Sequence, residues 1–283
     1  MIDLHSHSTC SDGSDSPARV MELAAAAGLG AVALTDHDNV AGLEEAAQRA
    51  RELGLEFVPG CEVSCAFEPG GMHLLCYFVD RAAGAFNDEL ARLREDRAGR
   101  NVRLLARLAE LGMPLDADEV AAQAGSEVVG RPHFAAVLVR RGHAESIEDA
   151  FDRYLKKGGV AYVARADAEV EEAIRLTVEA GGVAVLAHPH SLELAAPALD
   201  QLVEHLAGVG LGGIECLYGR YLPDERAALA ALARRYGLVA TGGSDFHGAY
   251  KPGLMIGSGL GDLAVPDEVL DELRARRRAI PAA

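Results

Sequence analysis

Residues 1–38 decide the fold and read MIDLHSHSTCSDGSDSPARVMELAAAAGLGAVALTDHD. Apolar residues predict short strands over 2–5 and 31–35, and helical spacing predicts a helix over 18–27. The Ser-Pro pair at 16–17 is typical of a helix start, because serine caps free N–H groups and proline suits the first helical position. A strand, a helix and a second strand in this order predict a βαβ unit with parallel strands.

The same alternation continues along most of the chain. Asp38 or Asn39 is expected to cap the second helix, and the Glu-Pro-Gly-Gly turn at 68–71 suits a hairpin. Six or seven strands predict an α/β fold with a mainly parallel sheet, too few for a regular eight-unit barrel but enough for a distorted one. Further strands are expected over residues 57–64, 72–79, 183–187, 213–217 and 238–241, and further helices over 40–53, 169–180, 196–207, 224–236 and 266–277.

The alternation stops in the middle of the chain, where residues 86–158 show helical spacing and no convincing strand. Helices are expected there over residues 87–111, 116–123, 132–141 and 146–155. We interpret this block as an inserted helical domain. The predicted organisation is therefore residues 1–85 and 159–283 for the two parts of the α/β domain, with 86–158 inserted between them.

The composition excludes two classes of partner. The chain has 27 Lys and Arg residues against 43 Asp and Glu residues, a formal charge of −16. A long nucleic-acid surface or an anionic membrane would require a positive surface, so neither is expected. No apolar run approaches the ~18 residues of a membrane span, and Asp3, His5 and His7 stand where a signal peptide would be apolar. We therefore expect a soluble, cytoplasmic protein.

Residues typical of metal ligands recur where the predicted strands end. Functional side chains of parallel α/β proteins gather at this edge, and burying so many titratable groups uncompensated would cost several kcal/mol each. Divalent cations remove that cost, and nitrogen and oxygen ligands without thiolate suit Mn, Fe or Zn. The set is too large for one tetrahedral ion and suffices for two or three. It consists of His5, His7, Asp12, His37, Glu62, His73, His188, Asp245 and His247. Asp36 is expected to orient one of these histidines.

Several short motifs in the chain resemble those of the PHP (polymerase and histidinol phosphatase) family of phosphoesterases. They are LHSHS at 4–8, SDG at 11–13, TDHD at 35–38, GCE at 60–62, MH at 72–73, AHPH at 187–190 and GSDFH at 243–247. The resemblance implies a distorted (β/α)7 barrel with a trinuclear metal centre at its carboxyl edge, Mn being the first expectation. It assigns His5, His7, Glu62 and Asp245 to one metal, Glu62, His73 and His188 to a second, and Asp12, His37 and His247 to the third.

The insertion resembles one subgroup of that family through VVGRPHFAAVLV at 128–139 and Tyr-Leu followed by Tyr-Val between 154 and 163. That subgroup hydrolyses nucleoside 3′,5′-bisphosphates and trims short RNA from its 5′ end. The resemblance implies that the inserted helices cap the barrel mouth and that Arg131 and His133 face the substrate. Two basic residues usual in the subgroup are missing or displaced: the His-Pro pair is followed by His190-Ser191-Leu192 where the subgroup has Gly-Arg-Tyr, and Gly159 stands where the subgroup favours lysine. Lys156, Lys157 and His190 are the candidate replacements.

The expected chemistry is attack on phosphorus by a metal-bound hydroxide held near Glu62 and Asp245, with Arg131, His133 and His190 binding substrate. Structural roles stay open for these three: a helix-start ion pair for Arg131, a cap-region hydrogen bond for His133 and solvent contact for His190. The alternative function is another phosphomonoesterase of the family, acting on histidinol phosphate or a small phosphate ester. A metal-binding module without turnover is the remote alternative.

Overall fold

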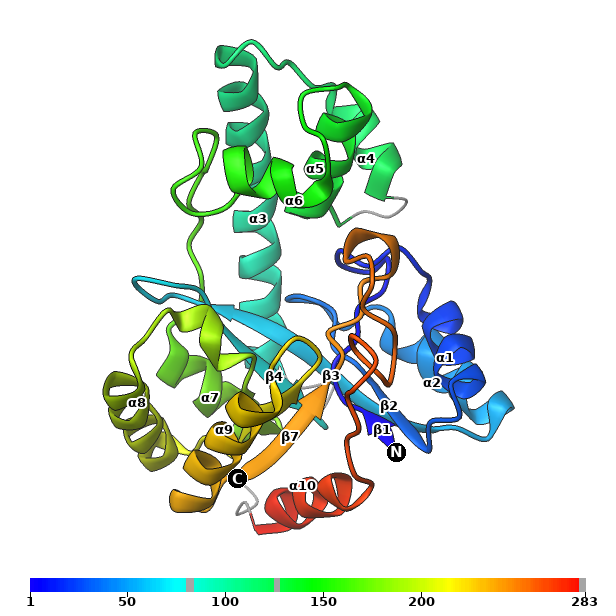
Figure 1. The fold of residues 1–283 in the computed structure, drawn as a ribbon, viewed down its shortest axis with the longest axis vertical. Coiled ribbons are helices and arrows are strands. Elements are labelled where there is room, and N and C mark those ends of the chain that lie inside the picture. Colours follow the sequence, from blue (N-terminus) through cyan, green and yellow to red (C-terminus); the bar gives the residue numbers. More distant parts are fainter. Residues whose placement is uncertain (80–83, 125–127, 280–283) are drawn as a thin grey trace.

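The computed structural model describes residues 1–79, 84–124 and 128–279, and within them the strands form one seven-stranded sheet in sequential order (Figure 1). The strands are β1 (Ile2–Asp3), β2 (Ala31–Leu34), β3 (Glu56–Cys65), β4 (Met72–Tyr77), β5 (Val183–Leu186), β6 (Gly213–Tyr218) and β7 (Val239–Gly243). β4 pairs antiparallel with both β3 and β5, and the other pairs are parallel. The hairpin at 68–71 is therefore confirmed.

The two edge strands meet, so that the sheet is a nearly closed barrel. Leu4 N donates to Gly242 O at 3.2 Å, and His7 N donates to Phe246 O at 2.9 Å. These contacts join the residues after β1 to β7 and the residues that follow it. β1 ends at Asp3 rather than at the predicted His5. The expected α/β fold with a distorted seven-strand barrel is confirmed.

Helices cover the barrel and close one end. They are α1 (Pro17–Ala26), α2 (Leu43–Leu53), α7 (Val170–Glu179), α8 (Ala196–Val209), α9 (Pro223–Arg235) and α10 (Glu268–Ala279), with 3₁₀ turns at Pro189–Leu192 and Gly248–Tyr250. Side chains alternate along β2, where Ala31 and Ala33 face the barrel interior and Val32 and Leu34 pack with α1 and α2. Leu273 of α10 joins the interior cluster at the barrel end opposite the inserted helices (Figure 1).

The start of α1 is as predicted, and the start of α2 is not. Ser16 Oγ accepts from Arg19 N at 3.2 Å, with Pro17 in the first turn. α2 begins at Leu43, three residues later than expected, and its N-cap is Gly42. Asp38 caps nothing, because its buried carboxylate is bound by Arg97 and Arg165. The prediction of a cap at Asp38 or Asn39 is wrong.

The inserted segment forms a helical lobe at one end of the barrel (Figure 1). It contains α3 (Gly84–Glu110), α4 (Ala117–Ala124), α5 (Arg131–Arg140) and α6 (Ile147–Ala150), which continues as a π-helical turn over Phe151–Leu155. The long helix α3 packs on the barrel through Phe86 and Leu90 and contributes Leu104 and Leu108 to a separate apolar cluster in the lobe. The proposed domain boundaries at 85/86 and 158/159 stay a prediction.

Replacing Leu273 by Ala should lower the free energy of unfolding by about 2–5 kcal/mol, since this side chain is fully buried in the barrel interior. Leu260→Ala is the control, because Leu260 is 61% exposed. Urea unfolding of both variants at equal metal content measures the difference. A loss below about 0.5 kcal/mol for Leu273→Ala would show that α10 does not close the barrel core.

Candidate metal centre

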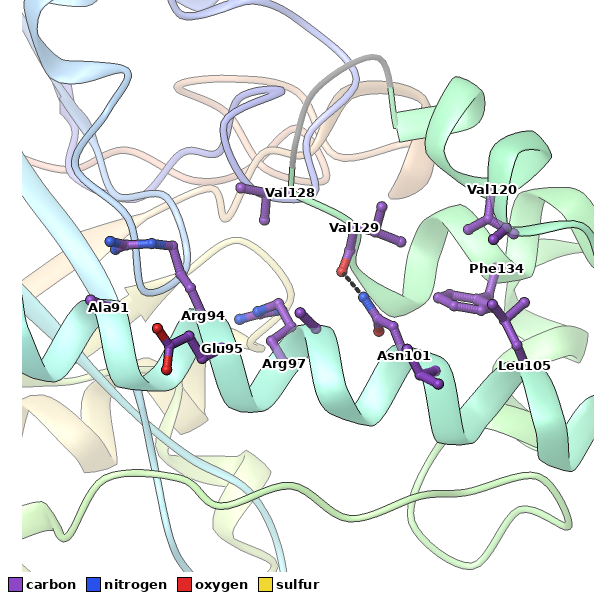
Figure 2. A pocket seen from close by; sticks show the side chains of 13 residues that line it. Ala91, Arg94, Glu95, Arg97, Asn101, Leu105, Val120, Val128, Val129 and Phe134 are labelled. Carbon is purple, nitrogen blue, oxygen red and sulfur yellow. Dashed lines mark hydrogen bonds between the residues drawn. The ribbon is translucent and has the colours of Figure 1, made fainter.

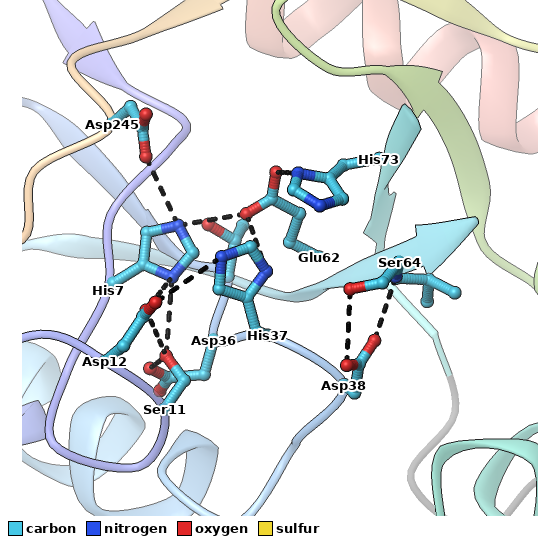
Figure 3. Close-up of polar contacts among 12 residues, drawn as sticks. His7, Ser11, Asp12, Asp36, His37, Asp38, Glu62, Ser64, His73 and Asp245 are labelled. Atoms are coloured by element: carbon cyan, nitrogen blue, oxygen red, sulfur yellow. Dashed lines mark hydrogen bonds and ion pairs between the residues drawn. The ribbon is translucent and has the colours of Figure 1, made fainter. Parts of the chain in front are cut away.

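The predicted ligand residues lie together at the end of the barrel that faces the helical lobe. Figure 3 shows His7, Asp12, His37, Glu62, His73 and Asp245 converging on one volume. His5 and His7 follow β1, Asp12 lies in the next loop, His37 follows β2, Glu62 lies in β3, His73 lies in β4, His188 follows β5, and Asp245 and His247 follow β7. His73 reaches this edge from the start of its strand because β4 runs antiparallel to its neighbours.

Glu62 stands at the centre of the cluster, with its carboxylate buried between imidazoles. Its Oε1 lies 2.9 Å from His73 Nδ1 and 2.9 Å from His188 Nε2. Its Oε2 lies 3.3 Å from His5 Nε2, 3.1 Å from His7 Nε2 and 3.2 Å from His37 Nδ1. The two oxygens of one side chain thus face two different sets of histidines, which is the geometry a bridging carboxylate requires.

Asp12 and Asp245 stand on either side of the remaining histidines. Asp12 Oδ1 is 3.2 Å from His247 Nε2, and its other oxygen is 3.8 Å from His37 Nε2. Asp245 Oδ1 lies 3.4 Å from both His5 Nε2 and His7 Nε2. Every predicted ligand is therefore within contact distance of at least one other.

The donor set fits divalent cations. The Nε2 atoms of His5 and His7 are 3.1 Å apart, a distance at which two lone pairs repel unless a proton or a cation lies between them. Four overlapping groups each bring three or more donor atoms within 4.8 Å of one another: His7, Asp12, His37 and His247; His5, His7 and Asp245; His5, Glu62 and His188; His37, Glu62 and His73. The division of these ligands among individual ions stays a prediction.

Electrostatics keep the carboxylates anionic. Burial by itself would raise the pKa of Glu62, but the imidazoles of His37, His73 and His5 hold it well below its usual value. Burial would likewise raise the pKa of Asp245, but the charges of Lys251, His5 and His247 hold it well below its usual value. Anionic oxygens are the form that binds a hard cation.

Glu215 is a buried partner of this centre that the sequence reasoning missed. Its Oε1 accepts a hydrogen bond from His5 Nδ1 at 2.8 Å, and its Oε2 accepts from the backbone N of His188 at 2.8 Å. A carboxylate on the outer nitrogen of a ligating histidine fixes the ring and raises its basicity. The available signal was an acidic residue inside the apolar strand β6, the same pattern that singled out Glu62.

Asp36 does not contact a histidine of the cluster directly, as the sequence predicted, but reaches one through a serine. It accepts hydrogen bonds from Ser8 N at 2.8 Å and from Ser11 Oγ at 2.6 Å. The Ser11 hydroxyl in turn lies 3.4 Å from His7 Nδ1 (Figure 3). Asp36 therefore positions Ser11, which faces the predicted ligand His7, rather than the histidine itself.

A cavity of about 290 Å³ opens above the donors. His190 lines it, and the His190 ring lies tilted against that of Tyr221, with 4.1 Å between the ring centroids. The role of His190 as a substrate contact stays a prediction. Lys251 and Tyr218, which the sequence reasoning missed, also line the cavity, and both bind the outer oxygen of Asp245.

Arg131 and His133 occupy different surroundings. Arg131 lines a second cavity, of about 440 Å³, whose wall also includes the metal-centre residue His73. His133 is fully buried, and its Nδ1 accepts from Gly130 N at 3.0 Å, which is the cap-region role left open by the sequence. Its Nε2 has no hydrogen-bond partner among the described residues.

A family model described as the PHP domain matches residues 3–163, more than half of the chain. The chain belongs to this family. It is 36% identical over 249 residues to the 5′-3′ exoribonuclease Rnm of Salmonella typhimurium, covering 87% of this chain and 85% of the relative. It is 35% identical over 257 residues to the 3′,5′-nucleoside bisphosphate phosphatase of Chromobacterium violaceum, covering 90% of each.

A solved structure from Bifidobacterium adolescentis, assigned as a metal-dependent phosphoesterase, superposes with a TM-score of 0.86 at 32% identity, covering 97% of this chain and 96% of that one. This PHP chain is thus an enzyme of the phosphoesterase class whose histidine and carboxylate clusters could bind metal. None of the helices in the described ranges is long and apolar enough to cross a membrane.

Replacing Glu215 by Gln should lower the affinity for divalent metal by about 10–100-fold, because the variant keeps the side-chain shape but loses the charge that supports His5. Glu171→Gln is the matched control, since this exposed glutamate contacts His205 Nε2 at 2.7 Å far from the cluster. Titration against a competing chelator measures both affinities. Unchanged affinity in Glu215→Gln would leave that carboxylate a purely structural role.

Proposed function

We propose that this protein removes the 3′-phosphate of nucleoside 3′,5′-bisphosphates, such as pAp, to leave the 5′-nucleotide and phosphate. The observation that carries the proposal is the 440 Å³ cavity, which joins His73 of the metal centre to the guanidinium of Arg131. A substrate with two phosphates could occupy both ends. The two relatives named for bisphosphate phosphatase and exoribonuclease activity support this reading. The 5′ end of a short RNA carries the same arrangement of phosphates and is a second substrate of the same site.

We further propose two or three divalent ions at the donor cluster, Mn first and Fe or Zn as alternatives. Such ions acidify water toward neutral pH and neutralise the oxygens of a phosphate ester. Glu62 and Asp245 supply the negative charge that holds them, and Glu215 fixes His5. Tyr218 and Lys251 fix Asp245 from outside, with Tyr218 Oη donating to its Oδ2 at 2.7 Å. Nothing in this scheme requires a protein nucleophile.

In this proposal, Arg131 binds the phosphate that is not cleaved. It donates Nη2 to Val163 O at 3.1 Å and stacks over the Tyr162 ring at 5.0 Å, so the guanidinium is held rigidly with its other donors available. A guanidinium binds phosphate through two parallel hydrogen bonds. His190 lines the smaller cavity, whose wall also contains five members of the donor cluster: His37, Glu62, His73, His188 and Asp245.

A second candidate is hydrolysis of a small phosphate monoester by the same donors. The smaller cavity of about 290 Å³ by itself accommodates a phosphate with a compact alcohol group, which favours this reading. The two candidates differ in whether the second cavity contributes to catalysis.

Glu62→Gln and Asp245→Asn should abolish phosphate release by the Mn-loaded protein, because each substitution removes charge from the ligands at the centre of the cluster. His205→Ala is the control and should stay within about twofold of the unsubstituted protein, since His205 is exposed and far from the site. Phosphate release is measured alongside elemental analysis of each variant. Near-full turnover by Glu62→Gln at normal metal content would exclude the central role given to this carboxylate.

Arg131→Ala should lower kcat/KM for a nucleoside 3′,5′-bisphosphate by roughly 10- to 150-fold, since a charge-assisted contact contributes about 1.5–3 kcal/mol. An aryl phosphate has no second phosphate and should be affected much less. Steady-state kinetics on both substrates measures the two ratios. Equal losses on both substrates would favour hydrolysis of a small monoester and would show that Arg131 has a structural role rather than a role in binding the second phosphate.

A further inference from the structure

Four arginines lie together under the helical lobe, and we call them the arginine cluster. Arg97 and Arg100 come from α3, Arg131 begins α5, and Arg165 lies in the segment before α7. Arg100 is only 1% exposed and Arg97 only 7%. Figure 2 shows Arg97 leaving α3 on the same side as Arg94. Guanidinium groups are rarely buried unless paired, so the charges around them matter.

The described residues provide fewer negative charges than the cluster has positive ones. Asp38 Oδ2 lies 2.6 Å from Arg97 Nη2 and 3.2 Å from Arg165 Nη1. Asp167 Oδ1 lies 2.6 Å from Arg165 Nε. Four guanidinium groups thus share two carboxylates, and neither Arg100 nor Arg131 makes an ion pair within the described part of the chain. Counted over the described residues, the cluster carries an excess of two positive charges.

Several donors of the cluster are also without a hydrogen-bond partner in the described residues. They are the buried Nε and Nη1 of Arg100 and the buried Nε of Arg97. Burial and the repulsion of Arg131, Arg97 and Arg165 lower the pKa of Arg100 well below its usual value. A buried, unpaired charge costs several kcal/mol, and an anion would remove that cost.

The cluster reaches the substrate cavity on one side. Arg131 and Arg165 both line the 440 Å³ cavity that includes His73. The lysines of the same wall, Lys156 and Lys157, are exposed, so water and salt screen their charges. Arg165 is itself paired with Asp38 and Asp167, but its side chain is only 8% exposed and is held in the cavity wall. Its less screened guanidinium is therefore the better replacement for the basic groups that the sequence lacks.

We propose that the arginine cluster is the subsite for the uncleaved phosphate, with Arg165 joining Arg131 as a direct contact and Arg97 and Arg100 supplying charge from behind. A phosphate monoester carries about −1.5 to −2 charges at neutral pH, which matches the excess of the cluster. This inference rests on the proposed function and deepens it, because it makes Arg165 a specificity-determining residue for substrates that bear two phosphates.

The first test is kinetic. Arg165→Met should lower kcat/KM for a nucleoside 3′,5′-bisphosphate by roughly 10- to 150-fold while changing that for an aryl phosphate by less than about threefold. Arg165→Lys should recover part of the loss. Arg107→Met is the matched control, because exposed Arg107 on α3 also binds the segment before Arg165, through Val160 O at 3.1 Å, but lies outside the cavity. Equal losses on both substrates for Arg165→Met would overturn the proposal.

The second test needs no turnover. Metal-free protein is titrated with millimolar sulfate, with sodium chloride holding the ionic strength constant, and the melting temperature is followed. Sulfate should raise the melting temperature of the unsubstituted protein, and Arg100→Met and Arg165→Met should lose most of this response. Without sulfate, Arg100→Met should be at least as stable as the unsubstituted protein, because it removes an unpaired buried charge. An equal sulfate response in all three proteins, or none in the unsubstituted one, would overturn the subsite.

The two tests separate the subsite from the proposed function. If the metal-loaded protein hydrolyses neither substrate, the proposed function fails, and the sulfate titration still decides whether the cluster binds an anion. If both substrates are hydrolysed and Arg165→Met behaves like Arg107→Met, the function stands and the subsite is wrong.

Discussion

The carboxylate of Glu62, buried among five imidazoles, is the interaction on which the rest of the structure depends. One oxygen meets His73 and His188, and the other meets His5, His7 and His37. Such an arrangement exists only if the ends of β1, β2 and β5 and the start of β4 reach the same point. The barrel satisfies this through one antiparallel strand, β4, and through closure between the residues that follow β1 and β7. The antiparallel strand and the closure of the barrel are thus what bring these six side chains to one point.

Two buried carboxylates that do not belong to the donor cluster, those of Asp3 and Glu215, fix the donor residues by hydrogen bonds. Asp3 Oδ1 accepts from the backbone N of His5 at 3.1 Å and of Ser244 at 2.9 Å, so one side chain fixes the junction of the first and last strands. Glu215 links two other segments, because it accepts from the His5 ring at Nδ1 and from the backbone N of His188. His188 and Asp245 adopt positive φ values of 24° and 56°, which non-glycine residues rarely adopt. The carboxylates and the closed barrel together stabilise this strained backbone.

Local patterns in the sequence predict most of the fold and all members of the donor cluster, because each donor lies within an apolar strand, closely follows one or, for Asp12, lies in the loop after the first strand. The seven strands and the helical insertion are found close to their predicted positions for the same reason. Residues whose role depends on packing between distant segments were missed. Asp38 resembles a helix cap in its own neighbourhood, yet it is bound by Arg97 from α3 and Arg165 from beyond the lobe. Lys251 lies in a loop with no periodic pattern, and only the fold brings it to Asp245.

The contacts of the lobe explain how an insertion can control the substrate of a barrel enzyme. Gly130, just before α5, packs so closely on the metal-centre loop that an added Cβ would lie 2.9 Å from the Cβ of Asp12. Arg97 of α3 meanwhile pairs with Asp38, next to the metal-centre residue His37. Both contacts tie the lobe to residues adjoining the donors, so the arginine cluster is fixed relative to the metal centre rather than carried on a free arm. In the proposed function, this fixed spacing between a cation site for one phosphate and guanidinium groups for another would select substrates by the distance between their phosphates, which a flexible lysine on a loop would do less strictly.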